Sequence, residues 1–278
     1  MEKIKISELK LRKWFLAQTG VLVAFSGGID SALLLFLARK YLGKGKVIGV
    51  ISKSSSLKER DLRQARVFAE RHDITLRIVE TNEIDDPEYN TNPPDRCFIC
   101  KNHLYHVLLQ VKREFPGFTI VNGTNKDDFL DFRPGHKAAE NYHVQSPLAL
   151  CGFSKKMIRE LAYSHHLDIW DKPASPCLSS RIPYGNPVTR KKLKQIEIAE
   201  EILNEYGFRE VRARHYDKTC KIEVSLNKIQ ELKTFFNEVS DKIIRNTGFK
   251  ECVMDEEGFI SGKLNKDIKK VGYGKLYS

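Results

Sequence analysis

The hexapeptide SGGIDS at residues 26–31 constrains this chain more than any other feature, because of where it stands. It follows VLVAF, a run typical of a buried strand, and precedes a stretch with apolar residues at helical spacing. Adjacent glycines let the backbone approach a ligand closely, and the free amides at a helix start attract phosphate oxygens. We therefore predict a phosphate-binding turn in which Ser26, Gly27, Gly28 and Ser31 contact a nucleotide.

The spacing within this motif argues against two other nucleotide-binding loops. No lysine follows the glycines as in GxxxxGK[ST], and the glycines are not spaced as in GxGxxG. The sequence therefore indicates neither γ-phosphoryl transfer nor a dinucleotide site. The alternative is a tight strand-to-helix connection without a ligand, which the whole hexapeptide in this position disfavours.

Short β-branched runs alternate with helical patterns over the first part of the chain. Strands are expected at residues 21–25, 47–52, 75–80 and 119–123, with helices between them. This alternation is typical of a parallel sheet that is covered by helices on both faces. We predict an α/β fold, a doubly wound parallel sheet over residues 1–182, followed by a smaller α+β domain over residues 183–278.

The second domain begins after a loop rich in proline and glycine. Thr189 is expected to cap a long helix that ends at Gly207, as Ser154 is expected to cap a helix in the first domain. Two strands, at residues 209–215 and 219–226, follow the long helix.

Composition restricts the partners of the protein. Apolar residues make up 41% of the 278 residues, and no apolar run approaches the ~20 residues that a membrane span needs. The N-terminal stretch is interrupted by charges and lacks the apolar core of a secretory signal, so we expect a cytoplasmic protein without a membrane partner. The net charge of +11 favours an anionic partner, but the lysines are scattered and form no stripe with aromatic residues.

Two further polar segments follow predicted strands and are expected at the same edge of the sheet as SGGIDS. Gly123 and Asp127 belong to NGTNKDD, after the fourth strand, and Ser54 follows the second strand. Open parallel sheets bind ligands at the carboxyl ends of their strands, so we predict nucleotide contacts from these residues. A capping turn, or a serine-rich turn around Ser54, is the structural alternative.

The six cysteines fall into two groups. Cys97 and Cys100 form a CxxC, and Cys177 stands in a loop bracketed by prolines; no second CxxC or histidine pair completes a zinc ribbon. The other three cysteines are predicted to pack in the core: Cys151, Cys220 and Cys252.

Five segments together resemble the LarE sulfur-insertion family of PP-loop enzymes. They are SGGIDS (26–31), PPDRCFICK (93–101), NGTNKDD (122–128), DFRPG (131–135) and KPASPCLSSRIPYG (172–185). PP-loop enzymes cleave ATP between the α and β phosphates. The resemblance implies adenylylation of pyridinium-3,5-biscarboxylic acid mononucleotide and replacement of oxygen by sulfur, in synthesis of the nickel-pincer cofactor of lactate racemase.

The resemblance also implies cofactors and residue roles. ATP would lie over the PP-loop, with Mg²⁺ on Asp30, and Arg133 would be a further nucleotide-binding residue. The predicted catalytic residues are Cys177, Asp30, Ser180 and Arg181. The partner is a small-molecule nucleotide substrate, and relatives that form hexamers imply a homo-oligomer; the sequence does not identify the sulfide donor.

Two sulfur sources are open within this family. In one, Cys177 gives up its own sulfur and becomes dehydroalanine. In the other, three cysteines hold a [4Fe-4S] cluster that carries an extra sulfide. The CxxC followed by a distant third cysteine favours Cys97, Cys100 and Cys177 as cluster ligands.

The predicted second domain offers a clamp for a substrate phosphate. Arg212 and Arg214 share one face of a strand, and Glu223 lies on the polar face of the next strand, where it could bind Mg²⁺ or a cation. Ordinary ion pairs on a half-solvated sheet are the structural alternative.

Other functions remain open at this point. The basic charge and the cysteine spacing also suit a cluster-dependent tRNA thiolase, although no RNA-binding module is evident and nucleic acid is therefore a less expected partner. An ammonia-using synthetase would leave the cysteines without a use. A nucleotide-sensing module would bind ATP without releasing pyrophosphate.

Overall fold

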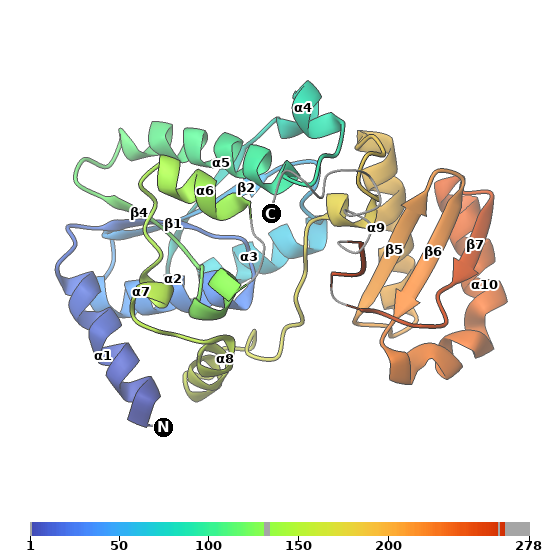
Figure 1. Ribbon diagram of the computed structural model, residues 1–278. Coiled ribbons are helices and arrows are strands. Elements are labelled where there is room, and N and C mark those ends of the chain that lie inside the picture. The colour runs from blue at the N-terminus through green and yellow to red at the C-terminus, as the bar shows by residue number, and fades with distance from the viewer. Residues whose placement is uncertain (1, 131–133, 261, 265–278) are drawn as a thin grey trace. The chain divides into compact units, whose positions relative to one another are not determined.

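The computed structural model describes residues 2–130, 134–260 and 262–264 (Figure 1). The chain divides into two units. Unit 1 consists of Met1–Glu83 and Cys97–Ser175, and unit 2 of Ile84–Arg96 and Pro176–Ser278. Each unit has its own sheet, as the sequence predicts.

The sheet of unit 1 is parallel throughout and has the strand order β3-β2-β1-β4. Its strands are β1 (Val21–Ala24), β2 (Val47–Lys53), β3 (Thr75–Glu80) and β4 (Thr119–Asn122). Val21 pairs with Val47 on one side and with Thr119 on the other, so β1 is a central strand. The four predicted strands are therefore confirmed, and with them the α/β fold class.

Helices cover both faces of this sheet because β1 is apolar on both sides. Val21 and Val23 pack toward one helical layer, and Leu22 and Ala24 pack toward the other. The first layer contains α1 (Glu2–Leu16), α2 (Ile29–Leu42), α3 (Glu59–Arg71), α7 (Pro147–Leu150) and α8 (Lys155–Ser164), and the second contains α5 (Arg96–Lys112) and α6 (Gly135–Asn141) (Figure 1). Ser154 caps α8 as predicted, because its side chain accepts a hydrogen bond from the Met157 amide at 3.3 Å.

The structure divides the chain before residue 182 and adds an earlier segment to unit 2. This segment, residues 84–96, contains the short helix α4 (Pro87–Asn90). The Tyr89 hydroxyl lies 2.6 Å from the hydroxyl of Ser179, and the Asn92 side-chain amide donates to the Ile182 and Pro183 carbonyls. Sequence patterns gave no sign of these contacts, because they join residues about 90 positions apart.

Unit 2 is an α+β unit built on a three-stranded sheet of order β5-β6-β7. Strands β5 (Val211–Tyr216) and β6 (Thr219–Val224) form the expected hairpin, and β7 (Glu251–Met254) adds in parallel to β6. The long helices α9 (Arg190–Glu205) and α10 (Ile229–Thr247) pack against each other and on this sheet. Thr189 caps α9, since its hydroxyl accepts from the Lys192 amide at 3.2 Å.

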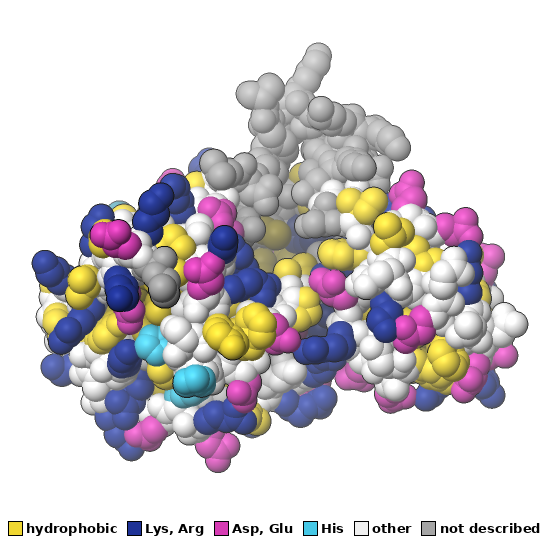
Figure 2. All heavy atoms as spheres, turned by 90° about the horizontal axis from the view of Figure 1, so that it is seen from below, with side chains coloured by type: hydrophobic (Ala, Val, Ile, Leu, Met, Phe, Trp, Pro, Cys, Tyr) yellow, Lys and Arg dark blue, Asp and Glu magenta, His cyan; other side chains and the backbone are white. Residues whose placement is uncertain are grey.

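The displayed face of each unit carries both signs of charge. Figure 2 shows Lys and Arg side chains interspersed with Asp and Glu rather than gathered into one basic stripe. Within the described part of the chain, none of the helices combines the length and the apolar character that crossing a bilayer requires.

His215 on β5 makes the stability of unit 2 depend on pH. Its ring is buried, and Nε2 lies 3.1 Å from the Gln195 side-chain oxygen. Burial, followed by the nearby charge of Lys192, lowers the pKa of His215 from 6.5 to about 4. Below pH 6.5 the unfolded chain therefore takes up a proton that the folded chain does not.

We expect the free energy of unfolding of unit 2 to fall by about 2 kcal/mol between pH 7 and pH 5 through this residue. His215→Gln should remove that part of the pH dependence, as measured by urea unfolding at both values. His106→Gln, at an exposed position of α5, is the matched control. An identical pH dependence in wild type and His215→Gln would contradict the assignment.

Candidate functional site

The SGGIDS loop joins β1 to α2 at the carboxyl edge of the sheet. The Ser31 hydroxyl accepts from the Ser26 amide at 3.2 Å and donates to the Gly28 carbonyl at 3.0 Å. The Ser26 hydroxyl lies 3.1 Å from the Ser31 hydroxyl and 3.4 Å from the Gly28 amide nitrogen. These contacts close the loop on itself and place its backbone at the start of α2, where amides bind phosphate oxygens.

Gly27 has a backbone conformation that few other residues adopt. Its φ is 72°, in the left-handed region where a Cβ is strained. Gly27 is therefore needed for the shape of the loop, apart from any ligand.

Gly123 follows β4 and lies directly against the start of α2. A Cβ built on Gly123 would lie 2.6 Å from the Ser31 amide nitrogen and 2.8 Å from its Cα. Both are backbone atoms, which cannot turn aside as a flexible side chain does. The structure thus explains Gly123 by its close approach to the SGGIDS loop; its predicted contact with nucleotide stays a prediction.

Gly123→Ala should therefore displace the start of α2. We expect a loss of about 1–3 kcal/mol in the free energy of unfolding, as for an overpacked core, and weaker nucleotide binding. Gly135→Ala is the matched control, because its Cβ would meet mainly the flexible side chain of Lys101. Thermal unfolding and nucleotide titration of the two variants measure the difference, and wild-type behaviour of Gly123→Ala would contradict this explanation.

Asp30 stands in the first turn of α2 and belongs to a polar network at the sheet edge. Its Oδ2 lies 2.5 Å from Lys155 Nζ, and its Oδ1 accepts from the buried Asn125 side-chain amide at 3.3 Å. Asn125 in turn donates to Asp128 at 2.9 Å. Asp30 is partly exposed, but both of its carboxylate oxygens accept hydrogen bonds here, one from Lys155 and one from Asn125, so Mg²⁺ on Asp30 stays a prediction.

Asp127 is exposed and holds the start of α8. Its Oδ2 accepts from the Lys155 backbone amide at 2.8 Å, and its own amide donates to the Asn125 side chain at 2.9 Å. Asp127 therefore positions the residue that pairs with Asp30. The sequence analysis did not predict a role for Lys155, because Lys155 is 125 positions from Asp30 and no local sequence pattern reports their contact.

A second ion pair, between Lys172 and Asp61, contacts the loop at the Gly27 carbonyl. Lys172 Nζ donates to the Gly27 carbonyl at 3.0 Å and to Asp61 at 2.9 Å. Ser175 donates to the other Asp61 oxygen at 2.8 Å. Lys172 and Ser175 lie in KPASPCLSSRIPYG (172–185), one of the five segments that resemble the LarE family. Their place in this segment is the only sign of a role that the sequence offers, and the sequence analysis predicts no role for either residue.

Ser54 lies beyond β2 at the same edge of the sheet. Its hydroxyl is 3.0 Å from that of the buried Ser56, which donates to Glu83 at 3.3 Å. The predicted contact of Ser54 with a base or ribose stays a prediction. Arg133, the other predicted nucleotide-binding residue, lies outside the described residues.

The predicted cluster ligands fall in different units. Cys97 and Cys100 occupy the first turns of α5 in unit 1, three positions apart and hence on one helix face. Cys177 belongs to unit 2, and all six cysteines are outside disulfides. No set of three or more His, Cys, Asp or Glu side chains within the described ranges is placed to hold a metal ion. The three-cysteine ligand set therefore stays a prediction.

The backbone of Cys177 is held by the last two residues of the LSSR turn (Leu178–Arg181). Its carbonyl accepts from the Ser180 hydroxyl at 2.7 Å and from Arg181 at 3.2 Å. Arg181 is fully buried, and its other nitrogen atoms donate to Glu200 at 2.7 Å and 3.1 Å. Both side chains therefore position Cys177, and the predicted catalytic role of the two residues stays a prediction.

Unit 2 contains buried arginines beside this turn. Arg212 lies 4.5 Å from the ring of Phe259, and burial, with the charges of Arg181 and Arg214, lowers its pKa to about 10. Arg214 pairs with both oxygens of Glu223, at 3.0 Å and 2.8 Å, and donates to the Ser180 carbonyl. Glu223 therefore orients a guanidinium here, and this arrangement does not present its carboxylate to the predicted Mg²⁺.

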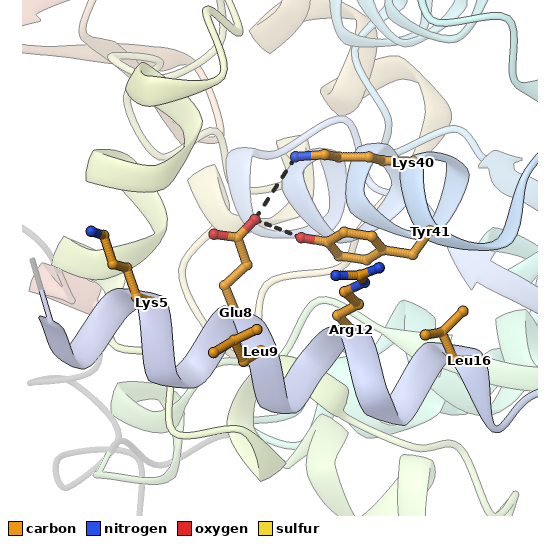
Figure 3. Close-up of a pocket in the computed structure, with 7 residues that line it drawn as sticks. All are labelled: Lys5, Glu8, Leu9, Arg12, Leu16, Lys40 and Tyr41. Atoms are coloured by element: carbon orange, nitrogen blue, oxygen red, sulfur yellow. Dashed lines mark hydrogen bonds and ion pairs between the residues drawn. The ribbon is translucent and has the colours of Figure 1, made fainter.

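A surface cavity of about 610 Å³ lies elsewhere in unit 1, between α1 and α2 (Figure 3). Glu8 contacts Tyr41 and Lys40 across it, at 2.5 Å and 4.0 Å. Its lining contains none of the predicted site residues.

Comparison with known proteins agrees with the loop geometry. Residues 10–95 match the NAD synthase family. The pyridinium-3,5-bisthiocarboxylic acid mononucleotide synthase of Lactiplantibacillus plantarum is 32% identical over 250 residues, 90% of each chain. An uncharacterized protein of Synechocystis is 37% identical over 264 residues, 94% of this chain and 97% of that protein. An NH₃-dependent NAD⁺ synthetase of Pyrococcus furiosus is 37% identical over 70 residues, 25% of this chain and 26% of that protein.

The fold, the SGGIDS loop and these similarities define an ATP-using enzyme of the PP-loop type. The match to the NAD synthase family, residues 10–95, covers the loop, whereas the match to the L. plantarum synthase extends over 90% of the chain. The chain belongs to the family of that synthase, the LarE family that its five segments resemble.

Proposed function

We propose that this protein uses ATP to adenylylate a carboxylate of pyridinium-3,5-biscarboxylic acid mononucleotide and then replaces oxygen by sulfur. The reaction would serve synthesis of the nickel-pincer nucleotide cofactor of lactate racemase. The observation that carries the proposal is the closed SGGIDS loop at the start of α2, in a chain similar over 90% of its length to a bisthiocarboxylic acid mononucleotide synthase.

In the first step, a substrate carboxylate oxygen attacks the α-phosphorus of ATP, and the bond to the β-phosphate oxygen breaks. The amides of Gly27 and Gly28 bind the departing pyrophosphate, because amides at a helix start are preorganised for anions. Mg²⁺ on Asp30 would offset the charge of that leaving group. Lys155 adds a positive charge at the same loop.

In the second step, sulfur attacks the acyl adenylate and expels AMP. If Cys177 is the donor, its thiolate forms a thioester, and β-elimination leaves a thiocarboxylate and dehydroalanine. A [4Fe-4S] cluster on Cys97, Cys100 and Cys177 would instead supply sulfide, which is the source that we favour from the cysteine spacing. Ser180 and Arg181 hold the Cys177 backbone in either route.

Unit 2 supplies cationic side chains for the substrate phosphate. Arg212 and Arg214 are the proposed ligands, with Glu223 orienting Arg214. Guanidinium groups bind phosphate oxygens in a bidentate manner, and in a buried setting such contacts are strong.

The test is incubation with ATP, Mg²⁺, a sulfide source and the carboxylated mononucleotide. Substrate-dependent formation of AMP and pyrophosphate is expected, together with a product whose mass reflects exchange of oxygen for sulfur. ATP cleavage that does not depend on the mononucleotide would refute the proposed substrate. ATP binding without pyrophosphate release would indicate a nucleotide sensor.

A cluster-dependent tRNA thiolase is the second candidate, supported by the net charge of +11 and the CxxC with a distant cysteine. It predicts tRNA binding that weakens steeply with salt. The mixed charges on the displayed faces favour the small nucleotide (Figure 2). Thiolation of tRNA, without turnover of the mononucleotide, would reverse this preference.

A further inference from the structure

The peptide unit between Gly27 and Gly28 is held from its carbonyl side. Lys172 Nζ donates to the Gly27 oxygen at 3.0 Å, and that carbonyl belongs to the same planar unit as the Gly28 amide. Fixing the oxygen therefore fixes the direction of the Gly28 N–H. A glycine pair has few steric barriers to rotation of this unit, so the loop needs an external contact to keep one orientation.

Asp61 keeps Lys172 at this place. Asp61 is buried on α3, and its two oxygens accept from Lys172 at 2.9 Å and from Ser175 at 2.8 Å. Burial by itself would raise the pKa of Asp61, but the charge of Lys172 and the hydrogen bonds from Lys172 and Ser175 outweigh it and lower that pKa. The carboxylate thus stays ionised near neutral pH and holds the ammonium group.

The Gly28 amide has donor capacity left for a ligand. Its contact with the Ser26 hydroxyl is long, 3.4 Å, which is beyond the usual range for an N–H···O bond. A cation at the Gly27 carbonyl polarises the peptide unit and strengthens donation by its N–H group. Lys172 therefore acts on this amide both by orientation and by charge.

We infer that Lys172 and Asp61 are positioning residues that present the Gly28 amide to pyrophosphate. The inference rests on the proposed function, since it deepens the role of the SGGIDS loop in holding the leaving group. Lys172 orients the peptide unit, and Asp61 orients Lys172.

The experiment compares pyrophosphate and AMP binding by calorimetry in the full chain. Lys172→Gln removes the cation, and we expect its affinity for pyrophosphate to fall about 10-fold or more, while its affinity for AMP changes little. Asp61→Asn should act in the same direction, and the double variant should be no weaker than Lys172→Gln alone, because both residues act through one contact. Lys172→Arg retains the charge and should recover most of the affinity.

Lys44→Gln is the matched control, because Lys44 is an exposed lysine of unit 1 that pairs with Asp73. It should bind both ligands as wild type does. Lys172→Gln with wild-type affinity for pyrophosphate would overturn the inference, as would equal losses for pyrophosphate and AMP, which indicate general damage. If Lys172→Gln does not fold, the ratio of pyrophosphate affinity to AMP affinity is compared in the other two variants. This ratio should fall in Asp61→Asn and stay near the wild-type value in Lys172→Arg. A wild-type protein that binds no pyrophosphate would instead refute the proposed function.

Discussion

Asp30→Ala is expected to lower the rate of pyrophosphate formation on the order of 1,000-fold. The reason is that a metal ion held by Asp30, as proposed, would contribute several kcal/mol of charge stabilisation, and each 1.36 kcal/mol corresponds to a factor of ten. Asp30→Asn should have a similar effect, although the amide can keep a contact with Asn125, because it removes the charge that binds the metal. Release of pyrophosphate from ATP, measured with saturating mononucleotide, is the readout.

The control for this prediction is Asp73→Ala. Asp73 is a carboxylate on the surface of unit 1 that pairs with Arg39 and Lys44, so its loss removes an acid without touching the loop. Its activity should equal that of wild type. Thermal unfolding of each variant separates loss of chemistry from loss of the fold, since Asp30→Ala leaves Lys155 without this carboxylate. A well-folded Asp30→Ala protein with substantial activity would refute the role of Asp30.

Cys177→Ala is expected to abolish sulfur incorporation, with a reduction of at least about 100-fold, while pyrophosphate formation continues. Sulfur transfer follows adenylylation, and Cys177 takes part in both proposed sulfur routes. Mass spectrometry of the mononucleotide measures incorporated sulfur, and AMP release measures the first step. Loss of both activities in a folded Cys177→Ala protein would contradict the separation of the two steps.

Cys97→Ala distinguishes the two sulfur sources. If the cluster is correct, anaerobically purified Cys97→Ala loses iron, acid-labile sulfide and sulfur transfer together. If Cys177 is sacrificial, Cys97→Ala keeps one round of transfer, iron is near zero in wild type and variant alike, and Cys177 becomes dehydroalanine. Cys151→Ala is the control, because Cys151 is a buried core cysteine of unit 1 and should affect neither measurement.

The regular elements could be predicted because their signals are local. The β1 sequence alternates between two buried faces, and the predicted caps Ser154 and Thr189 each accept from an amide three residues onward. The parallel strand β7 was not predicted. It is short, and it pairs with β6 only after the chain has passed through α10, a distance that no local pattern reports.

The site was predicted in part, for the same reason. The strand, the glycine pair and the start of the helix are consecutive in the chain, so the SGGIDS turn can be recognised from the sequence. Lys155 and Lys172 reach the loop from 125 and 145 positions away, through α8 and the segment that follows it. Arg181 was predicted as a catalytic residue because of its neighbours in the sequence, whereas its burial and its pairing with Glu200 depend on packing within unit 2.

The sequence by itself determined the class of protein: a parallel α/β sheet with a phosphate-binding turn at its carboxyl edge, in a chain with the segments of the LarE family. Periodicity and turn chemistry depend on adjacent residues, and a sequence contains that information directly. Only the tertiary structure decided how the charged side chains pair: in unit 1 it placed Lys155 on Asp30 and Lys172 on Gly27, and in unit 2 it placed Arg214 on Glu223. Such pairs are selected by burial, because a charge removed from water needs a partner that folding brings to it from elsewhere in the chain.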